Sequence, residues 1–366
     1  EQANLAIAIA VRLLNPSITV IAQGRTLSVT ANMASFGTDH IINPFARFSE
    51  RLALAITAPE RFRLIELLTA LPETPLPEIH RPPRGRWILC GYGRFGRLIA
   101  NQLMPAGIEL TIIDPSCNPE EMANSIRGYG TEAESLRSAG IGSAAGIIAG
   151  SDNDVNNLSI AVTAAELNPS LFVVARQNHH VNAPLFDAYR DDYTMVPSRI
   201  VAQECIAILT TPLLAAFLNL LREHDEAWSN ALVCRLQGLC DGRTPAVWGL
   251  KLNISEAQAA YRALMQERRM TLGEILRDGT DRSQPLPAVT LLIRREDELI
   301  LLPPDNLPLA PGDELLFASS LAARRNLELT LYRPGELDYV LTGHEVTGSW
   351  VWNWLAARHK AGDHPS

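Results

Sequence analysis

Short apolar runs alternate with helix-like stretches through the middle of this 366-residue chain. A short apolar run bounded by glycine, proline or asparagine is typical of a strand that is buried on both faces. Strands that alternate with helices in this way predict an α/β fold with a doubly wound parallel sheet. We predict strands at Trp87–Cys90, Ile108–Ile113, Ser125–Ile126, Gly146–Ala149, Leu171–Ala175 and Tyr193–Val196.

The chain also repeats itself at an offset of 153 residues. Glu1–Gln23 and Asp154–Arg176 are identical at ten of 23 aligned positions, including a shared Leu-Asn-Pro-Ser run. With no gap, Pro44 then falls on Pro197. A repeat of this length indicates a duplicated domain.

The repeat and the changes in composition divide the chain into five segments. Residues 1–72 are the C-terminal half of a first copy, whose own glycine loop is expected upstream of Glu1. Residues 73–85 hold four prolines and predict a linker. Residues 86–225 are a complete second copy, residues 226–320 a small α+β lobe, and residues 321–366 a C-terminal helix and tail.

Ser198–Leu221, near the end of the second copy, is a long helical run that Pro212 is expected to kink or split. It is apolar on so many sides that we expect a dimer contact there. The lobe that follows is predicted from short strand-like runs around one helix, Ser255–Met270. Those runs are Leu232–Leu239, Pro245–Leu252, Val289–Arg295, Asp297–Pro304 and Gly312–Ser319.

A glycine-rich turn follows the first predicted strand of the second copy. Gly91, Gly93 and Gly96 have the G-x-G-x-x-G spacing, with a helix-like pattern after them. Gly91 permits a tight turn, Gly93 lets a pyrophosphate approach the backbone, and Gly96 lets the helix pack on its strand. The alternative is a strand–helix turn whose glycines serve packing alone.

Two charged residues extend this Rossmann-like pattern. Arg94, inside the loop, can donate hydrogen bonds to phosphate. Asp114 closes the next apolar run and can accept hydrogen bonds from both hydroxyls of an adenosine ribose. A carboxylate there repels a 2′-phosphate, so the loop favours NAD or an adenine nucleotide (ADP, ATP or AMP) over NADP.

Composition excludes some partners. The net charge of −8 argues against a nucleic-acid partner. The five cysteines are odd in number and scattered, which favours reduced thiols, and no metal site is expected. No charge-free apolar run reaches about 18 residues, so we expect no membrane-spanning helix in this sequence.

Candidate ligand residues also follow later strands. Asp152 and Asp154, after the fourth strand, can meet a ligand or Ca²⁺, or can cap the next helix. Arg176, at the end of the fifth strand, can pair with phosphate or form a structural salt bridge. We find no set of residues that supports catalysis, so an enzyme is not expected.

The second copy resembles the RCK (regulator of potassium conductance) family, also described as Trk-type nucleotide-binding domains. The resemblance rests on the Gly91–Gly96 loop with Asp114, on Ser151–Asn157, on Leu167–Ser170 and on the runs 173–176 and 196–204. It implies nucleotide contacts from Phe95, Ser151, Asp152 and Arg176. Tyr129 stands where the family commonly has an acidic residue, and it can stack on an adenine ring instead.

The family implies a cytosolic ligand-sensing region that gates potassium conduction on nucleotide binding. Its partners would be further copies, as dimers assembled into a tetrameric or octameric gating ring, and a potassium pore upstream of residue 1 or in a partner subunit. It would lie at the cytoplasmic face of the inner membrane. Alternatives are a peripheral subunit of a Trk-type potassium uptake transporter and an NAD-dependent oxidoreductase.

Overall fold

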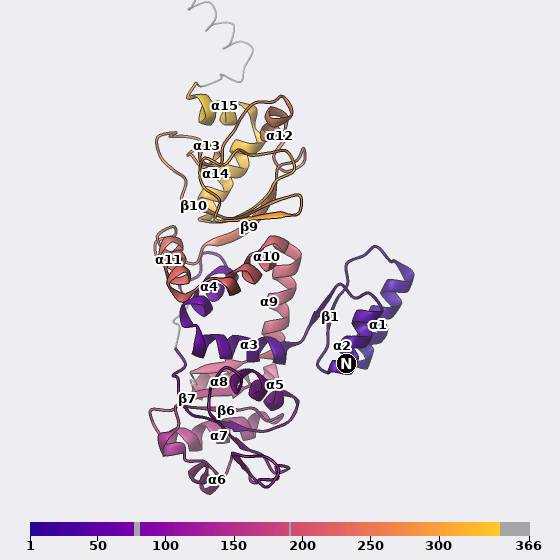
Figure 1. Cartoon of the computed structure of the whole chain (residues 1–366), viewed down its shortest axis with the longest axis vertical. Coiled ribbons are helices and arrows are strands. Elements are labelled where there is room, and N and C mark those ends of the chain that lie inside the picture. Colours follow the sequence, from indigo (N-terminus) through magenta and orange to yellow (C-terminus); the bar gives the residue numbers. More distant parts are fainter. Residues whose placement is uncertain (77–80, 190–191, 345–366) are drawn as a thin grey trace, which may run out of the picture. The chain divides into compact units, whose positions relative to one another are not determined.

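The computed structural model describes residues 1–76, 81–189 and 192–344 of the chain (Figure 1). It divides into two compact units. The first unit comprises Glu1–Arg63 and Glu78–Ile206, and the second comprises Leu64–Pro77 and Ala207–Ser366.

The first unit is built on a parallel sheet of six strands in the order β5-β4-β3-β6-β7-β8. This order confirms the predicted doubly wound Rossmann-like α/β fold. From β3 the chain adds strands first on one side (β4, β5) and then on the other (β6, β7, β8), so the strand order reverses between β3 and β6. Ligands of such sheets bind at the carboxyl ends of the strands beside the reversal. The strands are β3 (Trp87–Cys90), β4 (Leu110–Ile113), β5 (Ser125–Ile126), β6 (Gly146–Ala149), β7 (Phe172–Arg176) and β8 (Tyr193–Met195).

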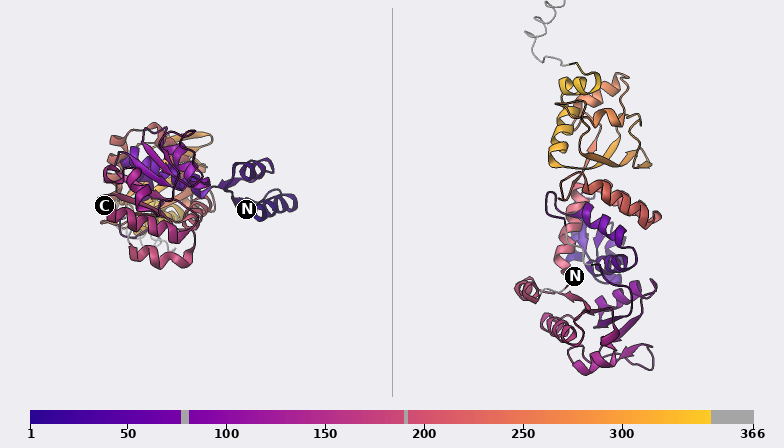
Figure 2. Two further views of the ribbon diagram at one scale, coloured as in Figure 1. Left: turned by 90° about the horizontal axis from the view of Figure 1, so that it is seen from below. Right: turned by 90° about the vertical axis from the view of Figure 1, so that its left-hand side faces the viewer.

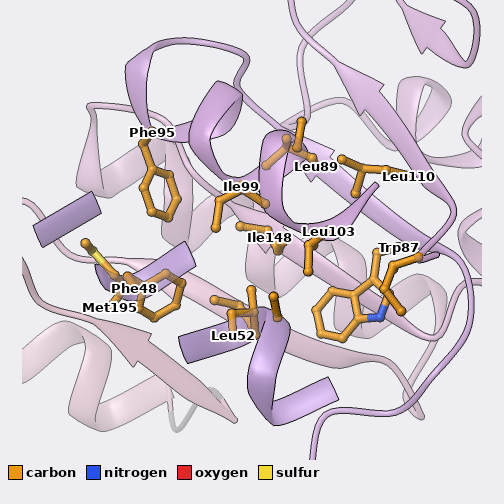
Figure 3. Close-up of a cluster of buried hydrophobic side chains, with 14 of the residues drawn as sticks. Phe48, Leu52, Trp87, Leu89, Phe95, Ile99, Leu103, Leu110, Ile148 and Met195 are labelled. Atoms are coloured by element: carbon orange, nitrogen blue, oxygen red, sulfur yellow. The ribbon is translucent and has the colours of Figure 1, made fainter. Parts of the chain in front are cut away.

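Both faces of this sheet are covered by helices. One face packs on α5 (Arg94–Leu103) and α3 (Pro44–Thr57), where Phe48, Leu52 and Phe95 meet Trp87 and Ile148 (Figure 3). The other face packs on α6 (Ala133–Ser138) and α7 (Asp154–Leu167). Helix α3 belongs to the first copy of the repeat, so this copy contributes to the core of the second.

The two copies of the repeat fold in the same way. At the offset of 153 residues, β2 (His40–Ile42) coincides with β8 at both ends, and α3 coincides with α9 (Pro197–Thr210) at both ends. Strand β1 pairs with β2 in parallel, with Ile21 opposite His40, as Val174 of β7 lies opposite Tyr193 of β8. The remaining elements are α1 (Gln2–Leu14), β1 (Ile21–Gln23), α2 (Leu27–Ser35), β2 (His40–Ile42), α4 (Pro59–Thr69), α8 (Ala183–Tyr189), α9 (Pro197–Thr210) and α10 (Pro212–Leu220).

The predicted break at Pro212 is confirmed, because α9 ends at Thr210 and α10 begins at Pro212. Among the described residues, no single helix is long and apolar enough to cross a membrane. The segments Pro197–Leu209 and Pro212–Glu223 would reach that length and composition only together.

The second unit contains an antiparallel sheet in the order β11-β10-β12-β9. The right-hand view of Figure 2 shows yellow helices beside the orange strands. One face packs on the lobe's C-terminal helices, and the other on α4, α10 and α11. The elements are α11 (Glu226–Gln237), β9 (Ala246–Lys251), α12 (Gln258–Met265), α13 (Leu272–Ile275), β10 (Ala288–Arg295), β11 (Glu298–Leu301), β12 (Glu314–Ser319), α14 (Leu321–Tyr332) and α15 (Pro334–Thr342).

Two predictions for this lobe were wrong. Leu232–Leu239 is not a strand but lies mostly in helix α11, where Leu232, Val233 and Leu236 are buried with helical spacing and Asp225 caps the first turn. The helix predicted at Ser255–Met270 is shorter, because Glu267 adopts a left-handed conformation with φ of 59° just beyond its end. The tail beyond residue 344 lies outside the described residues.

Candidate nucleotide site

The three loop glycines meet different physical demands. Gly91 has a φ of +99°, which favours glycine. A Cβ at Gly96 would lie 2.0 Å from the carbonyl oxygen of Gly91, so helix α5 packs too closely on the loop for any side chain. A Cβ at Gly93 would meet nothing within 4 Å. Backbone conformation therefore explains Gly91 and close packing explains Gly96, whereas Gly93 faces open space.

That space belongs to a cavity of about 510 Å³ at the carboxyl ends of the strands. Nine of the ten predicted site residues line it, and Gly96 lies behind the loop. The nine are Gly91, Gly93, Arg94, Phe95, Asp114, Tyr129, Ser151, Asp152 and Arg176. Sequence reasoning missed Phe45, Cys90, Ile113, Pro115, Gly128, Gly130, Thr131, Gly150, Asn156 and Ile160, which line it too.

Arg176, at the end of β7, places its positively charged guanidinium in this cavity, where the group has few hydrogen-bond partners. Its guanidinium lies 4.6 Å from the ring centroid of Phe45 and 5.4 Å from that of Phe95, both cation–π contacts. Its Nη1 donates a 3.4 Å hydrogen bond to the carbonyl of Gly150, and its buried Nε has no hydrogen-bond partner among the described residues. Burial lowers the pKa of Arg176 to about 10. The salt-bridge alternative is wrong, because no described carboxylate pairs with this side chain.

Asp114, at the end of β4, is tied to the loop. Its Oδ2 accepts a 2.7 Å hydrogen bond from the backbone N–H of Tyr92, and its Oδ1 accepts from the N–H (2.8 Å) and the hydroxyl of Ser116. Burial raises the pKa of Asp114, but these hydrogen bonds and the nearby Arg97 outweigh it and lower the pKa overall. The carboxylate is therefore ionised and fixed at the rim of the cavity.

Helix α7 fixes the opposite wall. Ser151 donates both its N–H (2.9 Å) and its hydroxyl (2.8 Å) to Oδ1 of Asn157. Asn157 in turn donates a 2.7 Å hydrogen bond to the carbonyl of Arg176, so this network sets where β7 ends. Asp152 is exposed at the rim of the cavity.

The interpretation of Asp154 as a helix cap or calcium ligand was wrong. The cap of α7 is Asn153, which accepts a 3.1 Å hydrogen bond from the N–H of Asn156. Asp154 is buried and accepts hydrogen bonds from the N–H groups of Asn178 (2.6 Å) and His179 (3.0 Å). It therefore holds the segment after β7 in place.

The first copy reaches the edge of this site. Phe45, at the start of α3, lies under Arg176, and the guanidinium of Arg25 lies 5.7 Å from the same ring. Oε2 of Glu1 lies 3.7 Å from Nη1 of Arg94. The exposed ring of Tyr129 lines the cavity from β5's side of the sheet. The repeat aligned Phe45 with Ser198, but nothing in that alignment placed it against the second copy.

No group of three or more His, Cys, Asp or Glu side chains in the described part of the chain could hold a metal ion. Cys90 and Cys117 are both buried, and burial raises the pKa of each thiol, that of Cys90 to about 12. The cavity thus offers hydrogen-bond donors, the half-buried cation of Arg176 and carboxylates, which suits a phosphate-bearing ligand more than a metal.

Residues 87–197 match the model of the TrkA-N domain. The chain is similar to potassium channel protein 1 of Methanocaldococcus jannaschii, with 28% identity over 147 residues that cover 38% of this chain and 44% of that protein. It is also similar to the glutathione-regulated potassium-efflux system protein KefC of an Enterobacter species, with 30% identity over 99 residues, 25% of this chain and 16% of that protein. The chain therefore spans less than half the length of these relatives.

Solved structures similar to this chain include the GsuK RCK domain and the GsuK channel bound to NAD. The first has 15% identity and a TM-score of 0.43, covering 94% of this chain and 79% of that chain. The second has 17% identity and a TM-score of 0.45, covering 90% of this chain and 65% of that chain. The match of residues 87–197 to the TrkA-N domain model confirms the resemblance drawn from the sequence.

Proposed function

We propose that this TrkA-N domain binds NAD or an adenine nucleotide (ADP, ATP or AMP) and that the chain is a regulatory region which performs no chemistry on that ligand. The observation that carries this proposal is Arg176, a half-buried guanidinium that lines the same cavity as the open loop at Gly93 and has no ion-pair partner among the described residues. A phosphate group would supply the missing partner.

The cavity suggests how the nucleotide lies. Its phosphates would meet the N-terminus of α5 beside Gly93 and Arg94, where N–H groups and the helix dipole favour an anion. Asp114 would accept a hydrogen bond from a ribose hydroxyl and would repel a 2′-phosphate. The exposed ring of Tyr129 would stack on the adenine.

The relatives support a wider role. We propose that nucleotide binding biases two arrangements of the chain and that this bias gates a potassium pore, in the same polypeptide or in a partner subunit, at the cytoplasmic face of the inner membrane. The ligand must bind the two arrangements unequally for this to work. Homo-oligomers in a ring would transmit the change. The similarity to KefC keeps a transporter subunit as the second candidate.

The binding step is tested by Gly93→Asp. No atom lies within 4 Å of the new Cβ, so the domain is expected to fold, but the carboxylate would repel phosphate from the helix N-terminus. We expect affinity for NAD and ADP to fall at least 100-fold by calorimetry, a loss of about 2.7 kcal/mol. Gly142→Asp is the matched control, because Gly142 also faces open space but does not line the cavity. Unchanged affinity in Gly93→Asp would exclude the loop.

The regulatory step is tested by potassium flux through the full-length assembly, with and without each nucleotide. A flux that responds to NAD or ADP in the wild type and not in Gly93→Asp supports gating. A flux that is indifferent to every nucleotide that binds would leave binding established and refute gating.

A further inference from the structure

A second cavity, of about 430 Å³, lies within the C-terminal unit. It is bounded by α11, α13, the loop 277–286 and the start of β10. Leu272, Leu276 and Leu286 form apolar walls. Its volume falls within the range of small-molecule sites, and none of its lining residues belongs to the TrkA-N domain.

Arginine side chains dominate the charge of this cavity. Arg235, Arg277 and Arg282 line it, against the single carboxylate of Asp305 among its lining residues. Arg282 is fixed in place, because it donates hydrogen bonds to the carbonyls of Val340 (2.6 Å) and Leu341 (3.0 Å) at the end of α15. These carbonyls carry no formal charge, and no carboxylate forms an ion pair with Arg282 in the described part of the chain.

Thr290 provides an independent sign of a ligand. It lies on β10, lines the cavity and is only 5% exposed, yet within the part of the chain that the structure describes its hydroxyl has no hydrogen-bond partner. A buried polar group without a partner costs about 1–3 kcal/mol. The strand has a register shift between Thr290 and Leu292, and such bulges re-aim side chains near binding sites.

We propose that this cavity binds a small molecule through a phosphate group. Arginines match phosphate oxygens through paired N–H groups, and three of them outweigh one aspartate. The hydroxyl of Thr290 would donate to the ligand, and the apolar walls would hold its organic part. The site is separate from the nucleotide cavity and does not depend on the function proposed for it.

The charge requirement is tested by titrating the chain with inorganic phosphate by calorimetry, with chloride at equal ionic strength as the reference. The Gly93→Asp background removes phosphate binding by the nucleotide loop. We expect saturable binding in that background and at least tenfold weaker binding after Arg277→Gln. The control is Arg325→Gln, an exposed arginine on α14 that does not line the cavity. No binding in the background, or equal loss in both variants, would overturn the proposal.

Thr290→Val separates a ligand contact from a structural role. It keeps the shape of the side chain and removes the unpartnered hydroxyl, so thermal stability is expected to stay level or rise while phosphate affinity falls two- to fivefold. Affinity that is unchanged by Thr290→Val, or a fall in stability that matches the fall in affinity, would remove Thr290 from the site and overturn the proposal.

Discussion

At the scale of single residues, the nucleotide loop separates packing from binding. Gly91 and Gly96 satisfy the backbone, since one needs a positive φ and the other leaves no room for a Cβ. Gly93 has neither requirement, so the open space beside it is available to a ligand. The sequence left two explanations for these glycines open, packing and ligand binding. Gly91 and Gly96 fit the first, and Gly93 fits the second.

This division predicts different costs for two alanine substitutions. Gly96→Ala places a methyl group 2.0 Å from the Gly91 carbonyl, so α5 must move, and we expect a loss of about 1–3 kcal/mol in the free energy of unfolding. Gly93→Ala, at the N-cap of α5, meets no clash and should cost less than about 1 kcal/mol. Urea unfolding of both variants measures the difference, and equal stabilities would contradict the close packing of α5 on the loop.

Asp154 predicts a pH dependence. Burial raises the pKa of Asp154, but hydrogen bonds from Asn182, Asn178 and His179 outweigh it and leave the pKa below its ordinary value of 3.8. A lowered folded-state pKa means that the ionised carboxylate stabilises the fold above pH 3.8 and that this contribution is lost as the pH falls through the folded-state value.

Asp154→Asn should therefore cost about 1–3 kcal/mol at neutral pH, because its NH₂ group would face N–H donors. The difference in the free energy of unfolding between variant and wild type should narrow as the pH falls below 3.8. Urea midpoints from pH 7 to pH 3 measure this gap. Asp187→Asn, at an exposed position on α8, is the control, and a gap that stays constant with pH would contradict the assignment.

At the scale of elements, helices α3 and α9 hold equivalent positions in the repeat but have different surroundings. Ile56 of α3 is 2% exposed, because α3 packs on the sheet of the second copy. The residue 153 positions later, Leu209 of α9, is 68% exposed. The same helical pattern therefore occurs twice, and among the described residues its position at Ile56 is buried whereas the equivalent position at Leu209 is exposed.

Ile56→Ala should lower the stability of the first unit by about 2–5 kcal/mol, since it leaves a cavity in the core. Leu209→Ala is the matched substitution, and it should change the stability of the second unit, to which Leu209 belongs, by no more than about 0.5 kcal/mol. Both are measured by chemical unfolding at a dilution where the chain is monomeric. A large effect of Leu209→Ala under these conditions would show that α9 is buried in the monomer.

The elements also show how far the sequence predicts this structure. Gly146–Ala149 is found at its predicted bounds, because an apolar run between glycines has one good solution in a parallel sheet. Helix α11 was missed, because Leu232–Leu239 in isolation fits a strand, and its cap at Asp225 lies outside that window. Phe45 could not be placed at the site, because its position depends on α3 packing across the repeat.

At the scale of the molecule, the repeat extends to individual hydrogen bonds. Asn4 donates to the carbonyl of Gln23 as Asn157 donates to that of Arg176. Glu1 accepts from the N–H groups of residues 25 and 26 as Asp154 accepts from those of residues 178 and 179. What was duplicated is therefore a hydrogen-bonded scaffold that tolerates a change from aspartate to glutamate.

The two compact units have separate cores, so heating should unfold them in two transitions. Nucleotide binds only the first unit in our proposal, and at 100 times its dissociation constant it should stabilise that unit by about 2.7 kcal/mol. Scanning calorimetry should then show one transition raised by several degrees and the other unmoved.

Ile293→Ala identifies the transition of the lobe, because Ile293 is fully buried in the lobe core and its truncation should cost about 2–5 kcal/mol there. If nucleotide raised both transitions equally, its binding energy would be shared between the units, and a sensor confined to the TrkA-N domain would be the wrong description. If it raises the first alone, any signal to a pore must leave through the surface of that unit.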